Sequence, residues 1–433
     1  MKILMVGGGA REDAICRNLS DHGHKVHACL SNRNPSILGR SSGYTIVSET
    51  DWETISSVAS VLSPDLVFVS PDAALDTPLV DTLLSSGHAV ASPSRKAAMI
   101  ETSKHFMRSV MERYSIEGNV WNRTFSDRDE MRKTVLAMKE EIVVKPLGLT
   151  GGKGVRVMGD HFSTREEGLA YAEEIISKDG RVLIEEKLRG EEFSLQAFCD
   201  GSRVIPMPLA QDYKRAFEGD TGPNTGGMGS ITDSSFLLPF VTGENRNRAL
   251  RILEKIARAL REEGSPFTGI LYGQFMVSRE GVRVIEINAR FADPEGINML
   301  ALMDDDLGEV LMKVATGDLN RNVKFTGKAS VLKYVVPVGY GSAPEPGDLS
   351  IDRGIERADV RLFYASVSGT VERVTMSRSR ALAIVALSDS IPEASGKVDA
   401  SLAMVHGRFS VRKDIGTEQM IRKKMQSLGY PAP

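Results

Sequence analysis

The stretch VVKPLGLTGGKGV at residues 143–155 decides the fold of the central part of this chain. An apolar run ends at Lys145, and the glycine-rich letters GGKG at 151–154 precede the next apolar run. This is not a Walker A loop, because Leu147 occupies its first glycine position and Gly154 stands where it needs Ser or Thr. Glycines between two strands favour a flap over a polyphosphate, although an exposed hairpin loop explains the stretch equally well. A lysine ending a buried strand needs an anionic partner.

A second stretch, RVIEINARF at residues 283–291, places polar side chains at every second position of an apolar strand. Side chains at positions i, i+2 and i+4 share one face of a strand, so Glu286, Asn288 and Arg290 point the same way. A carboxylate and a carboxamide oxygen suit Mg²⁺, which binds few protein ligands beside substrate phosphates. Arg290 can grip a carboxylate or phosphate with two hydrogen bonds. A solvent-exposed polar stripe is the alternative.

The preceding strand, LYGQFMV, is expected to pair with this one in a hairpin. If Gly281 takes the left-handed position of a three-residue loop, Gln274 lies opposite Glu286. That loop pairs Ser278 with Val282. Gln274 is then a third oxygen ligand on the same face. A two-residue loop would send it to the other face, so the metal trio depends on the turn.

A third stretch, QDYKRAFEGDTGPNTGGMG at residues 211–229, holds five glycines and a Lys-Arg pair in 19 residues. It is too glycine-rich for a helix and too polar for the core. Backbone N–H groups at 224–229, together with Lys214 and Arg215, can cradle a phosphorylated substrate. A mobile surface loop is the alternative, but long loops in compact chains are more often functional than idle.

The first 100 residues alternate short apolar runs with helical stretches. This alternation predicts a doubly wound α/β domain, in which parallel strands are joined by right-handed crossovers. The predicted strands are Lys2–Val6, Lys25–Leu30, Asp65–Val69 and His88–Ala91.

The letters GGGARE at residues 7–12 follow the first strand and open a helix, which is a context for phosphate binding. Glu12 stands where a dinucleotide fingerprint needs a third small residue, so dinucleotide binding is disfavoured. A sugar phosphate on Gly8, Gly9 and Arg11 remains open, as does a tight turn without a ligand.

Beyond residue 94 the sequence predicts single helices at Arg95–Tyr114 and Gly296–Val314, with β-rich texture after about residue 327. The fold class is a mixture of α/β and α+β in several domains. No Pro- or Ser-rich linker separates them, which predicts one compact unit. The predicted domains are an N-terminal α/β domain at 1–103, a central domain at 104–326 with a flap subdomain at about 119–190, and a β-rich domain at 327–433.

Composition excludes several classes of protein. The chain has 433 residues, of which 41% are hydrophobic and 26% charged, as in ordinary globular proteins. No apolar run is long enough to span a bilayer. The 54 basic and 57 acidic residues nearly cancel, which argues against a nucleic-acid partner. Three cysteines without a CxxC motif are typical of reduced thiols in the cytoplasm.

Taken together, the motifs resemble those of the glycinamide ribonucleotide synthetase (phosphoribosylamine–glycine ligase) family of the ATP-grasp superfamily. The resemblance runs over nearly the whole chain, from GGGAREDA through the three stretches above to RKDIG at residues 412–416. It implies an ATP-grasp fold for the central domain and a role in purine biosynthesis. ATP would phosphorylate glycine to glycyl phosphate, and 5-phosphoribosylamine would displace the phosphate.

The resemblance also implies roles for individual residues, with ATP and Mg²⁺ or Mn²⁺ as cofactors. The implied catalytic residues are Arg290, Lys145 and Asp212. The implied nucleotide-binding residues are Lys104, Lys145, Gly151, Gly152, Lys153, Glu185, Glu186, Leu188 and Glu192. The implied substrate-binding residues are Gly9, Asp212, Lys214, Arg215, Asn224, Gly226, Gly227, Met228, Arg290, Asp293 and Pro294. The implied metal ligands are Gln274, Glu286 and Asn288.

Four positions depart from the family pattern and leave amine specificity open, namely Ala10, Asp13, Gly296 and Ile297. One alternative is another ATP-grasp ligase, such as a phosphoribosyl carboxylase. A nucleotide-binding regulatory protein without catalysis is another. The expected partners are the small-molecule substrates alone, with neither nucleic acid nor membrane, in a cytoplasmic monomer or small homo-oligomer.

Overall fold

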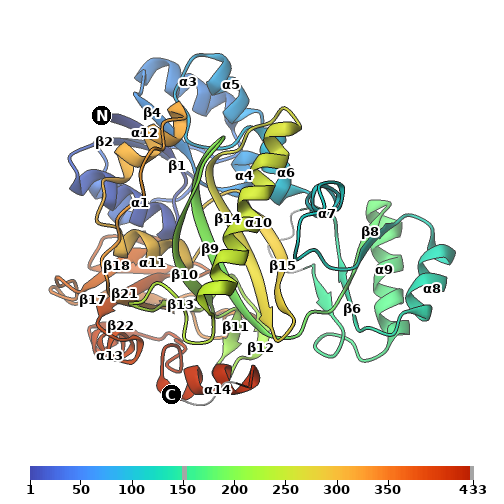
Figure 1. Cartoon of the computed structure of the whole chain (residues 1–433). Helices are drawn as coiled ribbons and strands as arrows, with labels where there is room; N and C mark the ends of the chain where they lie inside the picture. The colour runs from blue at the N-terminus through green and yellow to red at the C-terminus, as the bar shows by residue number, and fades with distance from the viewer. Residues whose placement is uncertain (149–153, 430–433) are drawn as a thin grey trace.

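The computed structural model describes residues 1–148 and 154–429 (Figure 1). Its N-terminal part is a sheet of four parallel strands in the order β3-β2-β1-β4, which confirms the predicted α/β class. The strands are β1 (Lys2–Val6), β2 (Lys25–Leu30), β3 (Gly43–Ile46) and β4 (Leu66–Val69). The helices are α1 (Ala10–Asp21), α2 (Pro35–Arg40), α3 (Trp52–Leu62), α4 (Asp72–Leu75) and α5 (Leu79–Ser85).

Two details of this sheet differ from the sequence expectation. The predicted strand at 88–91 makes only an isolated bridge, between Val90 and Val67 of β4. Strand β3 was missed, because it is a half-exposed edge strand of only four residues that begins with a glycine, which weakens the strand signal.

The long helix predicted at 95–114 is two helices, α6 (Arg95–Thr102) and α7 (Lys104–Arg113). Ser103 between them is extended, and its hydroxyl accepts a hydrogen bond from the N–H of Phe106. A serine in this position caps the second helix and so ends the first. Lys104 therefore begins a helix of its own.

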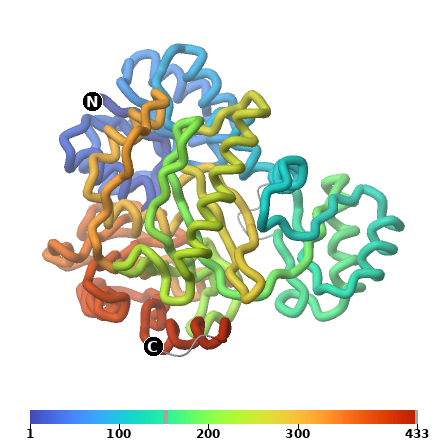
Figure 2. The backbone as a smooth tube through the Cα atoms, in the orientation of Figure 1, coloured from blue at the N-terminus to red at the C-terminus, as the bar shows by residue number. Residues whose placement is uncertain are grey.

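A small subdomain projects to one side of the main body (Figure 2). Its sheet has the order β5-β8-β6-β7, and two helices cover it over a separate apolar core that includes Phe125 and Leu169. The elements are β5 (Asn122–Phe125), α8 (Arg128–Ala137), β6 (Ile142–Lys145), β7 (Arg156–Val157), α9 (Arg165–Asp179) and β8 (Val182–Glu186).

The main body is built on an eight-stranded sheet in the order β15-β14-β9-β10-β13-β16-β21-β18. The strands are β9 (Glu191–Asp200), β10 (Val204–Asp212), β13 (Gly229–Thr232), β14 (Thr268–Ser278), β15 (Gly281–Asn288), β16 (Ala329–Val335), β18 (Val360–Tyr364) and β21 (Leu382–Ser388). Strand β13 pairs with β16 from Gly229↔Lys333 to Thr232↔Ser330. The sheet therefore contains strands from both sides of the predicted domain boundary at 326/327.

Helices of the main body flank this sheet. They are α10 (Gly243–Glu262), α11 (Glu295–Leu302), α12 (Leu307–Thr316) and α13 (Ile391–Leu402), whereas α14 (Glu418–Ser427) lies near the two strands at residues 215–224 in Figure 1. The helix predicted at 296–314 is broken in two, because Asp306 caps the second helix by accepting hydrogen bonds from the N–H groups of Gly308 and Glu309. None of the helices within the described ranges is long and apolar enough to cross a membrane.

The C-terminal part adds a four-stranded sheet in the order β19-β20-β17-β22. Its strands are β17 (Asp348–Ile351), β19 (Val367–Gly369), β20 (Arg373–Met376) and β22 (Val405–Gly407). A separate two-stranded hairpin, β11 (Arg215–Phe217) with β12 (Thr221–Asn224), lies close to α14 in Figure 1.

The β14–β15 hairpin has the expected pairing but reaches it by another route. Ser278 pairs with Gly281, so the loop has two residues and the predicted pairing of Ser278 with Val282 is wrong. Gln274 nevertheless lies opposite Glu286, because the register shifts between Gln274 and Phe275. Ile285 is the extra residue of a β-bulge at that point.

Candidate active site

A cavity of about 520 Å³ lies between the small subdomain, the main sheet and the β11–β12 hairpin. Most of the predicted site residues line it: Lys104, Lys145, Glu185, Glu186, Leu188, Glu192, Asp212, Lys214, Arg215, Asn224, Gly226, Gln274, Glu286, Arg290 and Asp293. Five predicted residues are outside its lining: Gly9, Gly227, Met228, Asn288 and Pro294. Gly151, Gly152 and Lys153 lie outside the described residues.

The anionic partner of Lys145 is a protein carboxylate. The Lys145 ammonium lies 2.6 Å from Glu185, which also receives two hydrogen bonds from the Arg108 guanidinium at 2.7 and 3.1 Å. Burial raises the pKa of Glu185, but the two cations outweigh burial and lower that pKa from 4.5 to about 2. Arg108 and Glu185 are almost fully buried, with side chains 1% and 4% exposed.

Arg108 also supports the bulge of strand β15. Its second terminal nitrogen donates to the backbone carbonyls of Val284 at 3.1 Å and Ile285 at 3.0 Å. A bulge takes a residue out of the ladder, so its carbonyls need other donors. Arg108 thus connects the small subdomain to the strand that carries Glu286. This role could not be predicted from the sequence, because Arg108 lies within an amphipathic helix that is distant in sequence from every glycine-rich stretch.

Glu286 supplies the one carboxylate of the predicted metal trio. Burial raises its pKa, but the ammonium groups of Lys214 and Lys145 hold the pKa of Glu286 below its ordinary value. The Asn288 amide donates to Glu286 over 3.4 Å. The Gln274 amide donates to Glu192 at 2.8 Å, and the Gln274 oxygen accepts from the Tyr272 hydroxyl. One carboxylate with neighbouring amides fits a hard cation that shares its ligands with phosphates.

Lys104 contacts the residues that come just before the glycine-rich letters at 151–154. Its ammonium donates to the carbonyl of Gly148 at 2.9 Å, and its backbone N–H donates to Leu147. Burial lowers the pKa of Lys104. Together with Lys145, it gives this end of the cavity two ammonium groups for an anionic ligand.

Arg290 is held by an acid that sequence reasoning missed. Glu101 of α6 forms an ion pair with the Arg290 guanidinium at 3.1 Å and accepts the N–H of Ala289 at 2.7 Å. Arg290 also donates to the carbonyl of Phe291 at 3.2 Å. These contacts fix the end of β15 and aim Arg290 along the cavity wall.

Two carboxyl groups in the cavity, those of Asp212 and Glu295, form no ion pair with any residue that the structure describes. Burial and the neighbouring Glu295 raise the pKa of Asp212 well above its ordinary value, and burial raises the pKa of Glu295. Glu295 accepts a hydrogen bond from the Tyr272 hydroxyl at 3.0 Å. Asp212 Oδ1 is buried without a hydrogen-bond partner in the described ranges. Glu295 was not among the site residues predicted from the sequence.

Other predicted substrate residues are occupied by protein contacts. The Asp293 carboxylate pairs with Arg380 at 2.9 Å and accepts from the Tyr334 hydroxyl at 2.6 Å. Lys214 pairs with Glu192 at 2.9 Å, and Arg215 with Asp160 of the small subdomain at 2.7 Å. Asp293 therefore holds the chain in place, since neither of its oxygens is free.

The N-terminal glycine loop closes on itself. The N–H of Gly9 donates to Glu12 at 2.9 Å, and Glu12 also binds Arg11 at 2.7 Å. Arg11 reaches the carbonyl of Phe291 at 2.8 Å, so the loop lies beside the end of β15. Asp13, one of the departures from the family pattern, is fully buried and accepts the N–H of Tyr364.

Comparisons with known proteins cover almost the whole chain. A sequence model described as the phosphoribosylglycinamide synthetase N domain matches residues 1–101, and one described as the ATP-grasp (A) domain of that synthetase matches residues 102–296. The chain is 45% identical to a phosphoribosylamine–glycine ligase of Pyrococcus horikoshii over 98% of this chain and 97% of that protein. It is 44% identical to the ligase of the same name from Thermococcus gammatolerans, with the same coverage.

Solved structures show the same fold. The crystal structure of a Thermotoga maritima phosphoribosylamine–glycine ligase superposes with a TM-score of 0.80 at 23% identity, covering 96% of this chain and 100% of that one. Biotin carboxylase of Campylobacter jejuni superposes with a TM-score of 0.77 at 16% identity, covering 100% and 97%.

Proposed function

The chain belongs to the phosphoribosylglycinamide synthetase family, and we propose that the cavity described above is the place where it carries out its reaction. It is an ATP-dependent ligase that joins glycine to 5-phosphoribosylamine in purine biosynthesis, and it uses ATP and a divalent cation. The glycine carboxylate takes the terminal phosphoryl group of ATP, and the amine then displaces phosphate. The products are glycinamide ribonucleotide, ADP and phosphate.

The lysine-lined end of the cavity is the proposed nucleotide side. Lys104 and Lys145 face the phosphates, and the glycine-rich stretch with Gly151, Gly152 and Lys153 completes their binding. Glu185 holds the Lys145 ammonium in place through their ion pair, while Glu186, Leu188 and Glu192 contact the nucleoside. Phosphoryl transfer needs positioned positive charge more than covalent chemistry, and fixed ammonium groups supply it.

The divalent cation, Mg²⁺ or Mn²⁺, is proposed to bind where Glu286 points into the cavity. Glu286 provides the charged ligand, and Asn288 and Gln274 add amide oxygens. A cation bound there would neutralise the negative charge that builds up on the transferring phosphoryl group. Gln274 must release Tyr272 to take part, since its oxygen accepts the Tyr272 hydroxyl.

The opposite wall is the proposed substrate side. Arg290 holds the glycine carboxylate in line with the phosphoryl group, and Asp212 accepts the proton that leaves the amine. Lys214, Arg215 and Asn224 bind phosphoribosylamine. Gly226 forms part of this wall, while Gly227, Met228 and Pro294 support it from outside the cavity lining. Asp293 acts through its contact with Arg380, and Gly9 through the N-terminal loop beside β15.

The observation that carries this proposal is that one cavity is lined by Lys145 from the sheet of the small subdomain, by Glu286 from the main sheet and by Arg290 just after strand β15. The test is ADP release with each substrate omitted in turn. Release is expected only when glycine, phosphoribosylamine and ATP are all present. Release that depends on bicarbonate would indicate a phosphoribosyl carboxylase, and no release at all would indicate a nucleotide-binding regulatory protein.

We also propose a cytoplasmic location, a monomer or small homo-oligomer, and only small-molecule partners. Light scattering with size-exclusion chromatography measures the oligomeric state. Titration of the metal-free enzyme with Mg²⁺ and Mn²⁺ measures the metal preference.

A further inference from the structure

The β11–β12 hairpin lines the cavity but has little to stabilise it from within. Its two strands share only the pairs Arg215↔Asn224 and Phe217↔Thr221, with an irregularity between them. A two-stranded hairpin on its own is marginally stable in water. Arg215, Asp220 and Asn224 nevertheless line the cavity. The hairpin must therefore be held in place by contacts outside its own ladder.

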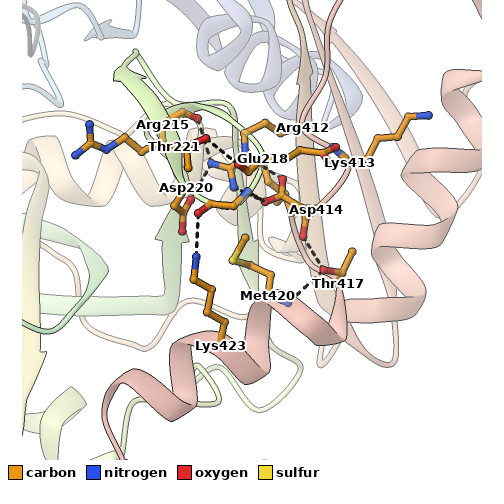
Figure 3. A network of polar contacts seen from close by, with 12 residues as sticks. Arg215, Glu218, Asp220, Thr221, Arg412, Lys413, Asp414, Thr417, Met420 and Lys423 are labelled. Atoms are coloured by element: carbon orange, nitrogen blue, oxygen red, sulfur yellow. Dashed lines mark hydrogen bonds and ion pairs between the residues drawn. The ribbon is translucent and has the colours of Figure 1, made fainter. Parts of the chain in front are cut away.

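Arg412, in the segment after β22, supplies the central contact (Figure 3). Its side chain is 1% exposed, and its guanidinium donates to the carbonyl of Arg215 at 3.1 Å and to the Asp220 carboxylate at 2.8 Å. Asp414 binds the other side of the guanidinium at 2.6 Å and accepts the N–H of Gly219 at 2.9 Å. Arg412 thus connects the first strand of the hairpin to its turn.

Helix α14 supplies a second contact to the same turn. The Lys424 ammonium lies 3.1 Å from Asp220 and 3.4 Å from Glu191, and 5.0 Å from the centre of the Tyr213 ring. Lys424 itself lines the cavity. Its neighbour Lys423 donates to the carbonyl of Gly219 at 2.9 Å.

Asp220 is the residue on which these contacts converge. Burial raises its pKa, but Lys424 and Arg412 hold the pKa of Asp220 below its ordinary value, so the carboxylate stays charged. Charged hydrogen bonds are stronger than neutral ones and carry more geometric specificity when an arginine makes them. The hairpin is fixed on its other side by the ion pair between Arg215 and Asp160.

We propose that Arg412 and Lys424 are positioning residues that hold the β11–β12 hairpin over the cavity and thereby set the affinity for phosphoribosylamine. The inference rests on the proposed function, which places that substrate against Arg215 and Asn224. It assigns a part in substrate binding to the C-terminal segment. This segment lies outside both sequence models, which match residues 1–101 and 102–296. Glycine and ATP bind elsewhere in the cavity and depend less on the hairpin.

The experiment compares Arg412→Lys and Lys424→Met with the parent enzyme. Arg412→Lys keeps the charge but loses the planar fork that reaches Asp220 and the Arg215 carbonyl together. We expect KM for phosphoribosylamine to rise about tenfold or more, with kcat at saturation and KM for ATP within about threefold of the parent. Hydrogen–deuterium exchange should become faster in residues 215–224 and stay unchanged in the main sheet.

The matched control is Arg422→Met, because Arg422 lies on helix α14 with Lys424 and, among the residues that the structure describes, pairs only with exposed Glu418. It is expected to behave like the parent in both assays. A fall in kcat that follows the folded fraction, with parental KM for phosphoribosylamine, would overturn the proposal. Unchanged hydrogen exchange in the hairpin of Lys424→Met would also overturn it, even if Arg412→Lys fails to fold. If the parent itself releases no ADP with phosphoribosylamine and glycine, the proposed function fails instead, and the exchange data alone decide on the hairpin contacts.

Discussion

Replacing Glu185 by glutamine should destabilise the protein although Glu185 lines the cavity. The carboxylate lies between Arg108 and Lys145, and its pKa is lowered from 4.5 to about 2. Each pKa unit corresponds to about 1.4 kcal/mol, so the charged interactions of Glu185 contribute about 3 kcal/mol near neutral pH. Glutamine keeps the size of the side chain but leaves two buried cations facing each other without their anion.

The pH dependence distinguishes this cause from a general packing defect. A lowered pKa means that the stabilisation is fully present above about pH 4.5 and is lost as the pH falls toward 2. The difference between parent and Glu185→Gln should therefore be about 3 kcal/mol at pH 7 and shrink as the pH falls below 4.5.

The assay is urea unfolding followed by tryptophan fluorescence and circular dichroism. Trp121 lies beside β8, since its carbonyl accepts the N–H of Glu186, and it reports on this region. Glu186→Gln is the matched control, because Glu186 is the next residue of the same strand and accepts only the N–H of Trp121 within the described ranges. Equal unfolding midpoints for Glu185→Gln and the parent at pH 7 would refute the reasoning, as would a difference that stays constant with pH.

Three further predictions concern Glu286, Asp13 and the domain boundaries. Glu286→Gln should abolish glycine-dependent ADP release at every Mg²⁺ concentration while leaving the fold close to intact, and near-parental turnover would exclude the metal assignment. Asp13→Asn should become more stable relative to the parent as the pH rises from 4 to 7, by up to about 4 kcal/mol. The reason is that burial raises the pKa of Asp13 from 3.8 to about 7, so that ionisation of Asp13 opposes folding in the parent. Urea unfolding of both proteins at pH 5 and pH 8 measures the difference. Limited proteolysis near the proposed boundaries, 103/104 and 326/327, should leave the fragments associated on size-exclusion chromatography, and a freely released end would contradict the compact unit.

The parts of the fold that depend on local pattern could be predicted from the sequence. Strands β1 and β2 are apolar runs bounded by turn residues, and their alternation with helices fixed the α/β class. The breaks at Ser103 and Asp306 were missed, because a capping side chain competes with a helical pattern that continues on both sides.

The bulge at Ile285 had a signal in the sequence that was not used. Val282, Val284 and Ile287 are buried in the core, so the apolar positions change from even to odd numbers within the strand. A regular strand cannot place all three on one face, and an extra residue between them can. The turn length alone was therefore a poor guide to the pairing of Gln274.

Other features of the site depend on distant parts of the chain. Arg108 meets Glu185 across 77 positions, and Arg380 meets Asp293 across 87. No short motif predicts such pairs, since each residue by itself is an ordinary charged residue of a helix, strand or loop. For that reason the sequence indicated that Lys145 needs an anionic partner but did not identify that partner as Glu185.

The bulge also bears on how this strand can change length in evolution. Ile285 has no partner residue on β14, because Phe275 pairs with Val284 and Gln274 with Glu286. Loss of this single codon would straighten the strand and leave Gln274 opposite Glu286, with Glu286 still facing the cavity. Arg108 would lose one of its two carbonyl acceptors on β15, and the core positions would stay as they are. Deletion of Ile285 is thus tolerable. Deletion of Ile287, which lies between Glu286 and Asn288, would instead turn the Asn288 side chain to the other face of the strand.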